Sequence, residues 1–151
     1  MIAANEWWDG AEKFQEMSSR DCSSGNEGFE GFLKIRRFLE PHWDPKGSGR
    51  HPLRSKFWVA SEPNYKGLSH FSKKLGLLEK VEGSDDPIAR LGVAEEYSGA
   101  WAELDFALRL QLAGISCEFV PRTSIPTPDL WCAIKDEKVD VEVTSIARPA
   151  H

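Results

Sequence analysis

The chain has 151 residues, a length that favours one domain or a small core with an extension. It is 40% hydrophobic and 28% charged, as globular proteins are, and its six Trp and eight Phe can bury a substantial core. No apolar run reaches the roughly 20 residues that span a bilayer, and the N-terminus lacks the pattern of a signal peptide. These features argue against a membrane protein. We therefore expect a cytoplasmic protein whose three cysteines are reduced.

Charge is distributed unevenly along the chain. The formal net charge is −5, which argues weakly against nucleic-acid binding. Residues 34–56, however, contain seven basic and two acidic residues, a local net charge of +5. This basic segment either contacts a phosphate backbone or is a solvated face that contacts nothing. The residues expected to contact phosphate are Arg36, Arg37, Lys46, Arg50, Arg54 and Lys56.

The first half of the chain predicts a mostly helical region. Apolar residues at spacings of three and four predict helices, and bulky residues around Phe57 predict a short strand. The helices are expected over residues 5–18, 29–39 and 65–81, and the strand over residues 56–60. Pro41 ends the second helix, and a turn over residues 83–87 marks the main boundary. We therefore predict a helical N-terminal region over residues 1–88 and an α/β core over residues 89–151.

The second half predicts a helix followed by three strands. A stripe of large apolar residues predicts a helix over residues 93–113, and Gly114 suits the position that follows a helix end. The stripe consists of Trp101, Leu104, Leu108 and Leu112. Strands are expected over residues 115–121, 129–134 and 138–145, with a tight turn at residues 135–137. The fold class is therefore α/β or α+β.

Two carboxylates on this predicted hairpin could hold a metal ion. Asp129 opens one strand and Glu142 lies late in the other, so the two become near neighbours across the hairpin. Glu142 shares the polar face of its strand with Asp140 and Thr144. Mg²⁺ prefers oxygen ligands and keeps several waters, so two or three carboxylates suffice for a site that acts on phosphodiester bonds.

Short motifs in this half resemble the PD-(D/E)xK nuclease superfamily. Pro128-Asp129 resembles the first motif, Val141-Glu142-Val143 the second, and the Glu103 helix the first helix of the restriction-endonuclease-like core. The resemblance covers residues 92–145. It implies that Asp129 and Glu142 bind Mg²⁺ or Mn²⁺, and that Glu103 is an accessory ligand or an orienting residue. In the family pattern, the catalytic lysine would stand at position 144, two residues after Glu142.

The chain departs from the family pattern at two points. Thr144 stands where the family has a lysine, so the positive charge that would stabilise the transition state is absent. Lys135 and Lys138 are the nearby lysines that could replace this charge, but they lie at the far end of the hairpin from Asp129 and Glu142. The family core also continues with another helix and strand. We expect these from a longer protein, from the N-terminal half, or from a second copy in a homodimer.

The leading interpretation is a Mg²⁺-dependent endonuclease that hydrolyses phosphodiester bonds in nucleic acid, with DNA as the expected substrate. If it is active, a cation such as Arg50 or Arg54 must approach the carboxylates. The alternative is a catalytically inactive nuclease-like fold that binds nucleic acid or protein. A third interpretation is wholly structural: Asp129 is a turn residue, Glu142 lies on an exposed strand face, and Glu103 lies on a surface helix.

Overall fold

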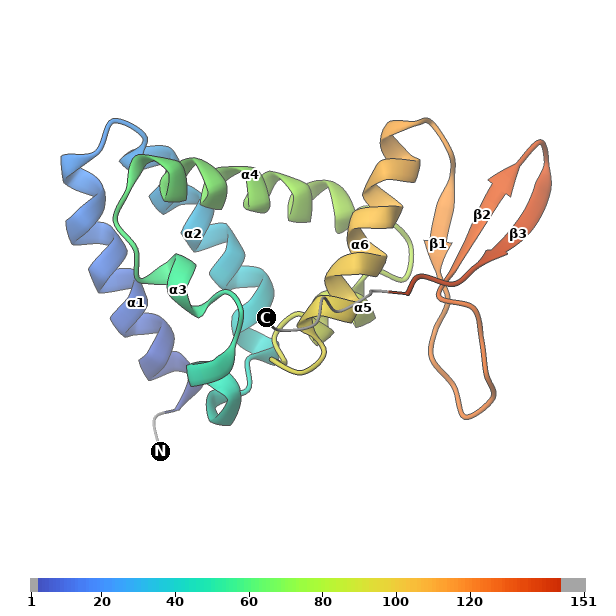
Figure 1. Ribbon diagram of the computed structural model, residues 1–151, viewed down its shortest axis with the longest axis horizontal. Coiled ribbons are helices and arrows are strands. Elements are labelled where there is room, and N and C mark those ends of the chain that lie inside the picture. The colour runs from blue at the N-terminus through green and yellow to red at the C-terminus, as the bar shows by residue number, and fades with distance from the viewer. Residues whose placement is uncertain (1–2, 145–151) are drawn as a thin grey trace, which may run out of the picture.

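The computed structural model describes residues 3–144, without the side chain of Ser48, and has an α+β architecture. Six α-helices precede a three-stranded sheet that lies at one end of the molecule (Figure 1). The elements are α1 (Ala4–Ser18), α2 (Gly25–Leu39), α3 (Arg54–Phe57), α4 (Glu62–Leu78), α5 (Asp85–Arg90), α6 (Tyr97–Leu112), β1 (Cys117–Phe119), β2 (Leu130–Ile134) and β3 (Glu137–Val141). Among the described residues, no helix has the length and apolar character needed to cross a membrane.

Two glycines bring α2 and α4 into close contact. A Cβ atom on Gly28 would lie 2.5 Å from Cβ of Tyr65, and one on Gly31 would lie 2.8 Å from the carbonyl oxygen of Leu68. Both distances are shorter than van der Waals contact, so only glycine fits between these backbones. The two helices form the centre of the helical region and bury Phe32, Ile35 and Tyr65.

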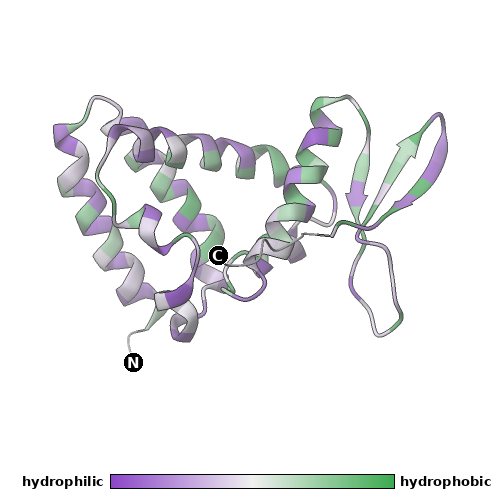
Figure 2. Cartoon of the chain, viewed as in Figure 1, coloured by the Kyte–Doolittle hydropathy of each residue, from purple (hydrophilic) through white to green (hydrophobic). Residues whose placement is uncertain are grey.

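One hydrophobic core runs from the helical region to the sheet. It extends from Trp8 in α1 to Leu130 in β2, and α6 connects the two parts through Leu104 and Ala107. Trp101 of α6 packs on Phe71 of α4, with ring centroids 5.0 Å apart. Apolar and polar positions alternate along α2, α4 and α6, as helices with one buried side require (Figure 2). The sheet is therefore anchored to the helices through α6.

The helix that carries Glu103 confirms the predicted C-terminus and corrects other details. Gly114 has φ +77°, and the N–H of Ile115 donates to the Leu110 carbonyl at 2.9 Å, as in a glycine-capped helix end. The helix begins at Tyr97 rather than at residue 93. The preceding backbone is diverted because Gly92 packs against the His42 backbone and accepts a hydrogen bond from Asp44 N–H at 3.2 Å. Leu112 is 73% exposed, so the predicted apolar stripe stops short of it.

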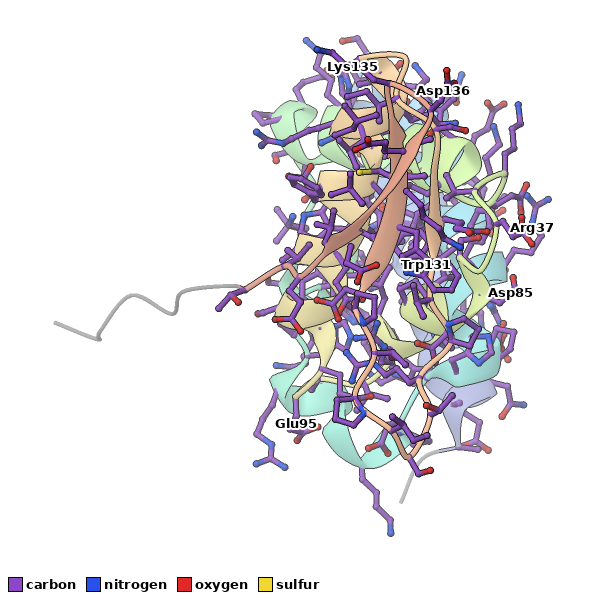
Figure 3. All side chains as sticks on the ribbon, turned by 90° about the vertical axis from the view of Figure 1, so that its right-hand side faces the viewer. Arg37, Asp85, Glu95, Trp131, Lys135 and Asp136 are labelled. Carbon is purple, nitrogen blue, oxygen red and sulfur yellow. The ribbon has the colours of Figure 1, made fainter. Side chains whose placement is uncertain are left out.

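The three strands are antiparallel in the order β1-β2-β3, and the β2–β3 hairpin agrees with the prediction. A two-residue turn at Lys135 and Asp136 joins β2 to β3, and both residues have positive φ. This geometry matches a tight hairpin turn of type I′. The turn lies at the tip of the sheet in Figure 3, and it is one residue shorter than predicted.

Strand alternation gives the sheet an inner and an outer face. Phe119 and Leu130 are buried on the inner face, against α6. Trp131, adjacent to Leu130, belongs to the outer face. β3 ends at Val141, earlier than predicted, and residue 145 of the expected strand lies outside the described residues.

The helical region confirms the three predicted helices and corrects two connections. The strand expected over residues 56–60 is wrong, because α3 and an irregular segment occupy this region. Side chains bind its carbonyls instead of a neighbouring strand: Gln15 donates to Phe57 at 2.7 Å, and Asn64 donates to Val59 at 2.9 Å. The turn expected over residues 83–87 continues into α5, since a proline in the first turn of a helix is tolerated.

Candidate functional site

Glu103 is buried in an ion-pair cluster. Its side chain lies on the face of α6 that turns toward α5, and the residue is only 5% exposed. Arg90 of α5 donates to Oε2 in a short contact, and Arg122, just beyond β1, donates to Oε1 at 3.1 Å. The interpretation of Glu103 as a residue of a surface helix is therefore wrong. Burial of this carboxylate requires the two guanidinium groups that neutralise it.

Arg90 joins this cluster to a third carboxylate. Its side chain is 12% exposed, and its Nε lies 3.2 Å from Oδ2 of Asp86, one turn earlier in α5. Burial alone would lower the pKa of the Arg90 guanidinium, but hydrogen bonds and charge from Glu103, together with Asp86, outweigh it and raise the pKa. Arg90 therefore keeps its positive charge in a largely buried position.

A cavity of about 280 Å³ opens beside this cluster. Its walls come from α5, α6 and the loop between Val120 and Asp129. Arg90, Glu103, Arg122 and Asp129 all line it. The structure thus brings Glu103 and Asp129 to one cavity, together with two arginines that could bind an anion.

Asp129 lies where regular pairing between β2 and β3 ends. Its N–H donates to the Val141 carbonyl at 3.0 Å, and its carboxylate accepts from Val143 N–H at 2.8 Å. The last regular pair is Leu130 with Val141, so Asp129 lies beside Val141 and Glu142. The predicted neighbourhood of Asp129 and Glu142 along the two strands follows from this register.

The remaining predicted residues of the site are exposed. Glu142 and Thr144 both point to solvent, and neither lines the cavity that contains Glu103 and Asp129. Between residues 3 and 144, no group of three or more His, Cys, Asp or Glu side chains is arranged to hold a metal ion. The three predicted carboxylates therefore do not form one cluster in this structure. The strand register still leaves Asp129 and Glu142 as neighbours that could form a two-carboxylate site.

The basic segment lies partly beside α5 and partly away from these carboxylates. Its middle part contacts the chain just after α5, where Asp44 N–H donates to the Gly92 carbonyl at 3.2 Å. Helix α3, which carries Arg54 and Lys56, is at the opposite end of the molecule from the sheet (Figure 1). Arg36 is held by three carboxylates, with contacts of 2.7 Å to Asp9, 3.4 Å to Glu12 and 2.8 Å to Glu40. The hydrogen bonds that Arg36 donates to Glu40 are the main cause of the raised pKa of Arg36. The other basic residues named for phosphate contact are exposed: Arg37, Lys46, Arg50, Arg54 and Lys56.

Sequence reasoning missed Arg90 and Arg122. The spacing of Asp86 and Arg90, one helical turn apart, could have indicated an ion pair in α5. No local pattern identifies Arg122, because only the path of the chain after β1 brings it to Glu103.

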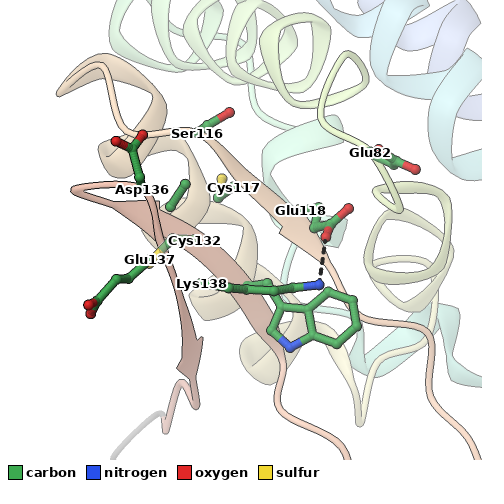
Figure 4. Close-up of a pocket in the computed structure, with 10 residues that line it drawn as sticks. Glu82, Ser116, Cys117, Glu118, Cys132, Asp136, Glu137 and Lys138 are labelled. Carbon is green, nitrogen blue, oxygen red and sulfur yellow. Dashed lines mark ion pairs between the residues drawn. The ribbon is translucent and has the colours of Figure 1, made fainter.

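A second cavity, of about 510 Å³, lies along the sheet and is lined by residues from both of its faces (Figure 4). The ammonium group of Lys138 lies 3.3 Å from the Trp131 ring centroid and 3.7 Å from Glu118 Oε1. This cation–π contact holds Lys138 against the sheet. Lys138 therefore points along the outer face rather than toward the cavity beside Glu103.

Comparisons of the chain with family models, with curated proteins and with solved structures found no match.

Proposed function

We propose that the chain is a Mg²⁺-dependent endonuclease-like domain of the restriction-endonuclease type, which hydrolyses phosphodiester bonds in DNA. The observation that carries the proposal is the cavity between α5, α6 and the loop from Val120 to Asp129. It joins the Asp129 carboxylate, next to Glu142 along the strands, to the guanidinium groups of Arg90 and Arg122. Carboxylates bind Mg²⁺ and guanidinium groups bind phosphate, so this cavity contains groups for both the metal ion and the phosphate of a substrate.

In this proposal Asp129 and Glu142 each supply a carboxylate oxygen to the metal. The hydrogen bond from Val143 N–H fixes the Asp129 carboxylate, and the exposure of Glu142 lets its side chain turn toward it. When bound, Mg²⁺ would activate water and offset charge on the phosphate. Glu103 is a positioning residue rather than a ligand, because arginines already engage both of its oxygens.

Arg122 is the residue that supplies the charge missing at Thr144. Its side chain is 56% exposed while one nitrogen contacts Glu103, so the guanidinium can bind Glu103 and a phosphate oxygen together. Arg50 and Arg54 are less suitable, because neither lines the cavity and Arg54 lies in α3, away from the sheet. Their role in the proposal is limited to contact with the phosphate backbone.

A second candidate function is a non-catalytic binding module of the same fold. It is favoured by the complete engagement of Glu103 with arginine and by the neutral side chain of Thr144. In that case Arg90 and Arg122 would recognise a phosphate or another anion without hydrolysis.

Thermal melting with and without millimolar Mg²⁺ or Mn²⁺ tests metal binding. Metal should raise the Tm of the wild type by about 3–5 °C, because it binds only the folded state. Asp129→Ala and Glu142→Ala should each abolish the shift. Asp140→Ala is the matched control, since it removes an exposed carboxylate from the same hairpin and should keep the shift. A wild-type Tm that is indifferent to both metals would exclude the nuclease and leave the binding module.

Cleavage of DNA at saturating substrate tests the arginine. Arg122→Ala should lower turnover at least about tenfold, because a charge that stabilises the transition state is lost. Arg54→Ala should change only the substrate concentration needed for half-maximal rate, since backbone contacts position the substrate without entering the chemistry. Equal turnover in Arg122→Ala and wild type would show that Arg122 does not act in the chemical step.

A further inference from the structure

Two of the three cysteines face each other across adjacent strands. The register between β1 and β2 pairs Cys117 directly with Cys132. The N–H of Ala133 donates to the Ser116 carbonyl at 2.9 Å, and the N–H of Val120 donates to the Asp129 carbonyl at 3.1 Å. Hydrogen-bonded and non-hydrogen-bonded pairs alternate in an antiparallel ladder. The cysteine pair, one step from Ser116 and Ala133, is therefore non-hydrogen-bonded.

This position has the geometry that a disulfide needs. Cα atoms of a non-hydrogen-bonded pair are about 4.5 Å apart, inside the range of about 4.4–6.8 Å seen across disulfides. Both side chains lie on the inner face of the sheet with Phe119 and Leu130, and Cys117 Sγ lies 3.8 Å from the Ala107 carbonyl of α6. Both are thiols in this structure. Burial raises the pKa of the Cys117 thiol, and the neighbouring Cys132 thiol raises it further.

The two sulfurs differ in accessibility. Cys117 is half-buried and Cys132 is 3% exposed, and both line the cavity along the sheet (Figure 4). A small oxidant therefore reaches Cys117 first, and Cys132 is the thiol beside it. Cys22 lies between α1 and α2, in the helical region, and supplies an internal control.

We propose that Cys117 and Cys132 form a reversible cross-strand disulfide when the protein meets a peroxide. The Cys117 thiol attacks the peroxide, the O–O bond breaks, and sulfenic acid and one water form. The Cys132 thiol then attacks the sulfenic sulfur, the S–S bond forms and a second water leaves. Two thiols are thus oxidised by two electrons, and hydrogen peroxide is reduced to two waters. A dithiol reverses the step by exchange.

The link would close the loop that carries the candidate site. Residues 118–131 lie between the two cysteines, and they include Arg122 and Asp129. In the reduced protein this loop is held by noncovalent contacts, among them strand pairing, the Arg122–Glu103 ion pair and the hydrogen bond from Val143 N–H to Asp129. In the oxidised protein the disulfide would close this loop covalently, three residues after Asp129. This inference does not depend on nuclease activity.

The test treats the full chain with hydrogen peroxide and measures the product by intact mass and by alkylation of free thiols. Wild type and Cys22→Ser should each lose two hydrogens as monomers, with one peptide linking residues 117 and 132. Cys117→Ser and Cys132→Ser should show no such loss. Oxidation should raise the Tm by about 5 °C or more, reversed by dithiothreitol. It should be faster at higher pH, because the thiolate is the reactive form.

Three outcomes would overturn the proposal. In the first, Cys117 proceeds to sulfinic acid in the wild type while Cys132 remains alkylatable after unfolding. In the second, the link involves Cys22 or joins two chains. In the third, no mass loss occurs at any peroxide concentration that leaves the protein folded. Because these readings come from the wild type, they do not depend on whether the serine variants fold.

Discussion

Glu103 shows how a single buried charge can order two segments that are separate in the sequence. Its carboxylate joins α5 through Arg90 and the segment after β1 through Arg122. A buried ion pair of this kind adds little stability compared with apolar side chains, but breaking it leaves an uncompensated charge. Its main effect here is therefore to fix which guanidinium groups border the cavity.

We predict that Glu103→Gln lowers the free energy of unfolding by about 3 kcal/mol, because it leaves the buried Arg90 guanidinium without its main partner. Urea denaturation measures the change. Asp105→Asn is the matched control on the same helix, where an exposed pair with Arg109 contributes at most about 1 kcal/mol. Equal effects of the two substitutions would contradict the assignment of a buried pair.

His51 is a second buried polar residue, and its environment favours the neutral ring. Nδ1 accepts a hydrogen bond from Leu53 N–H at 3.1 Å, so Nε2–H donates to the Leu91 carbonyl at 2.6 Å. The ring also packs on Trp43, with centroids 4.2 Å apart. Burial lowers the pKa of His51, and the contacts with Leu91 and Glu95 only partly oppose this. A structural role follows, because both ring nitrogens are engaged.

The lowered pKa predicts a loss of stability in mild acid. Below the unfolded pKa of about 6.5, the unfolded chain takes up a proton that the folded state excludes, so stability falls as pH decreases toward the folded pKa. The Tm of the wild type should therefore decline between pH 7.5 and pH 5. His51→Gln should reduce this slope, although its Tm at pH 7.5 is lower. His70→Gln, at an exposed histidine, should keep the wild-type slope.

At the scale of elements, the contact between α2 and α4 depends on glycine at specific positions. Gly28 and Gly31 face the backbone of α4 at distances that exclude a side chain, whereas Gly67 and Gly76 on α4 have open space around the Cβ position. The same residue type therefore has opposite consequences in the two helices. In α2 it permits close packing, and in α4 it only weakens helix propensity.

We predict that Gly28→Ala destabilises the protein by about 1–3 kcal/mol, since the added methyl group collides with the Tyr65 side chain and backbone. Gly76→Ala should stabilise it by about 0.5–1 kcal/mol, the difference in helix propensity. Thermal and urea denaturation of both variants provide the measurement. A stabilising Gly28→Ala would show that the two helices can separate without cost.

At the scale of the molecule, the continuous core makes the helices and the sheet interdependent. The N–H of Phe119 in β1 donates to the Glu82 carbonyl at 2.8 Å, and Trp101 packs on Phe71. These contacts cross the boundary near residue 88 that the sequence predicts. Residues 89–144 consequently share their core with the helical region.

We predict a single unfolding transition for the whole chain. Tryptophan fluorescence and far-UV circular dichroism should give the same midpoint in urea, as for one cooperative unit. A fragment of residues 89–151 should show no cooperative transition, because it lacks the partners of Trp101 and Leu104 in the helical region. Separate midpoints, or cooperative melting of the fragment, would establish two domains.

Local rules of the sequence determined most of the elements. The apolar spacing of α6 and its terminal Gly114, and the alternation of Val139 and Val141 in β3, are short-range signals that need no knowledge of the fold. They predicted the α+β class, the three longer N-terminal helices and the hairpin that carries Asp129 and Glu142. The strand expected over residues 56–60 failed because Gln15 and Asn64, at other places in the chain, bind its carbonyls.

The surroundings of the candidate site were decided by tertiary structure alone. Arg90 and Arg122 converge on Glu103 only because α5, α6 and the segment after β1 pack together, and no local pattern encodes that meeting. The pairing of Cys117 with Cys132 likewise depends on the register of two strands joined by a long loop. Secondary structure reflects interactions within a few residues, whereas burial, charge neutralisation and cross-strand contacts depend on segments that only folding brings together.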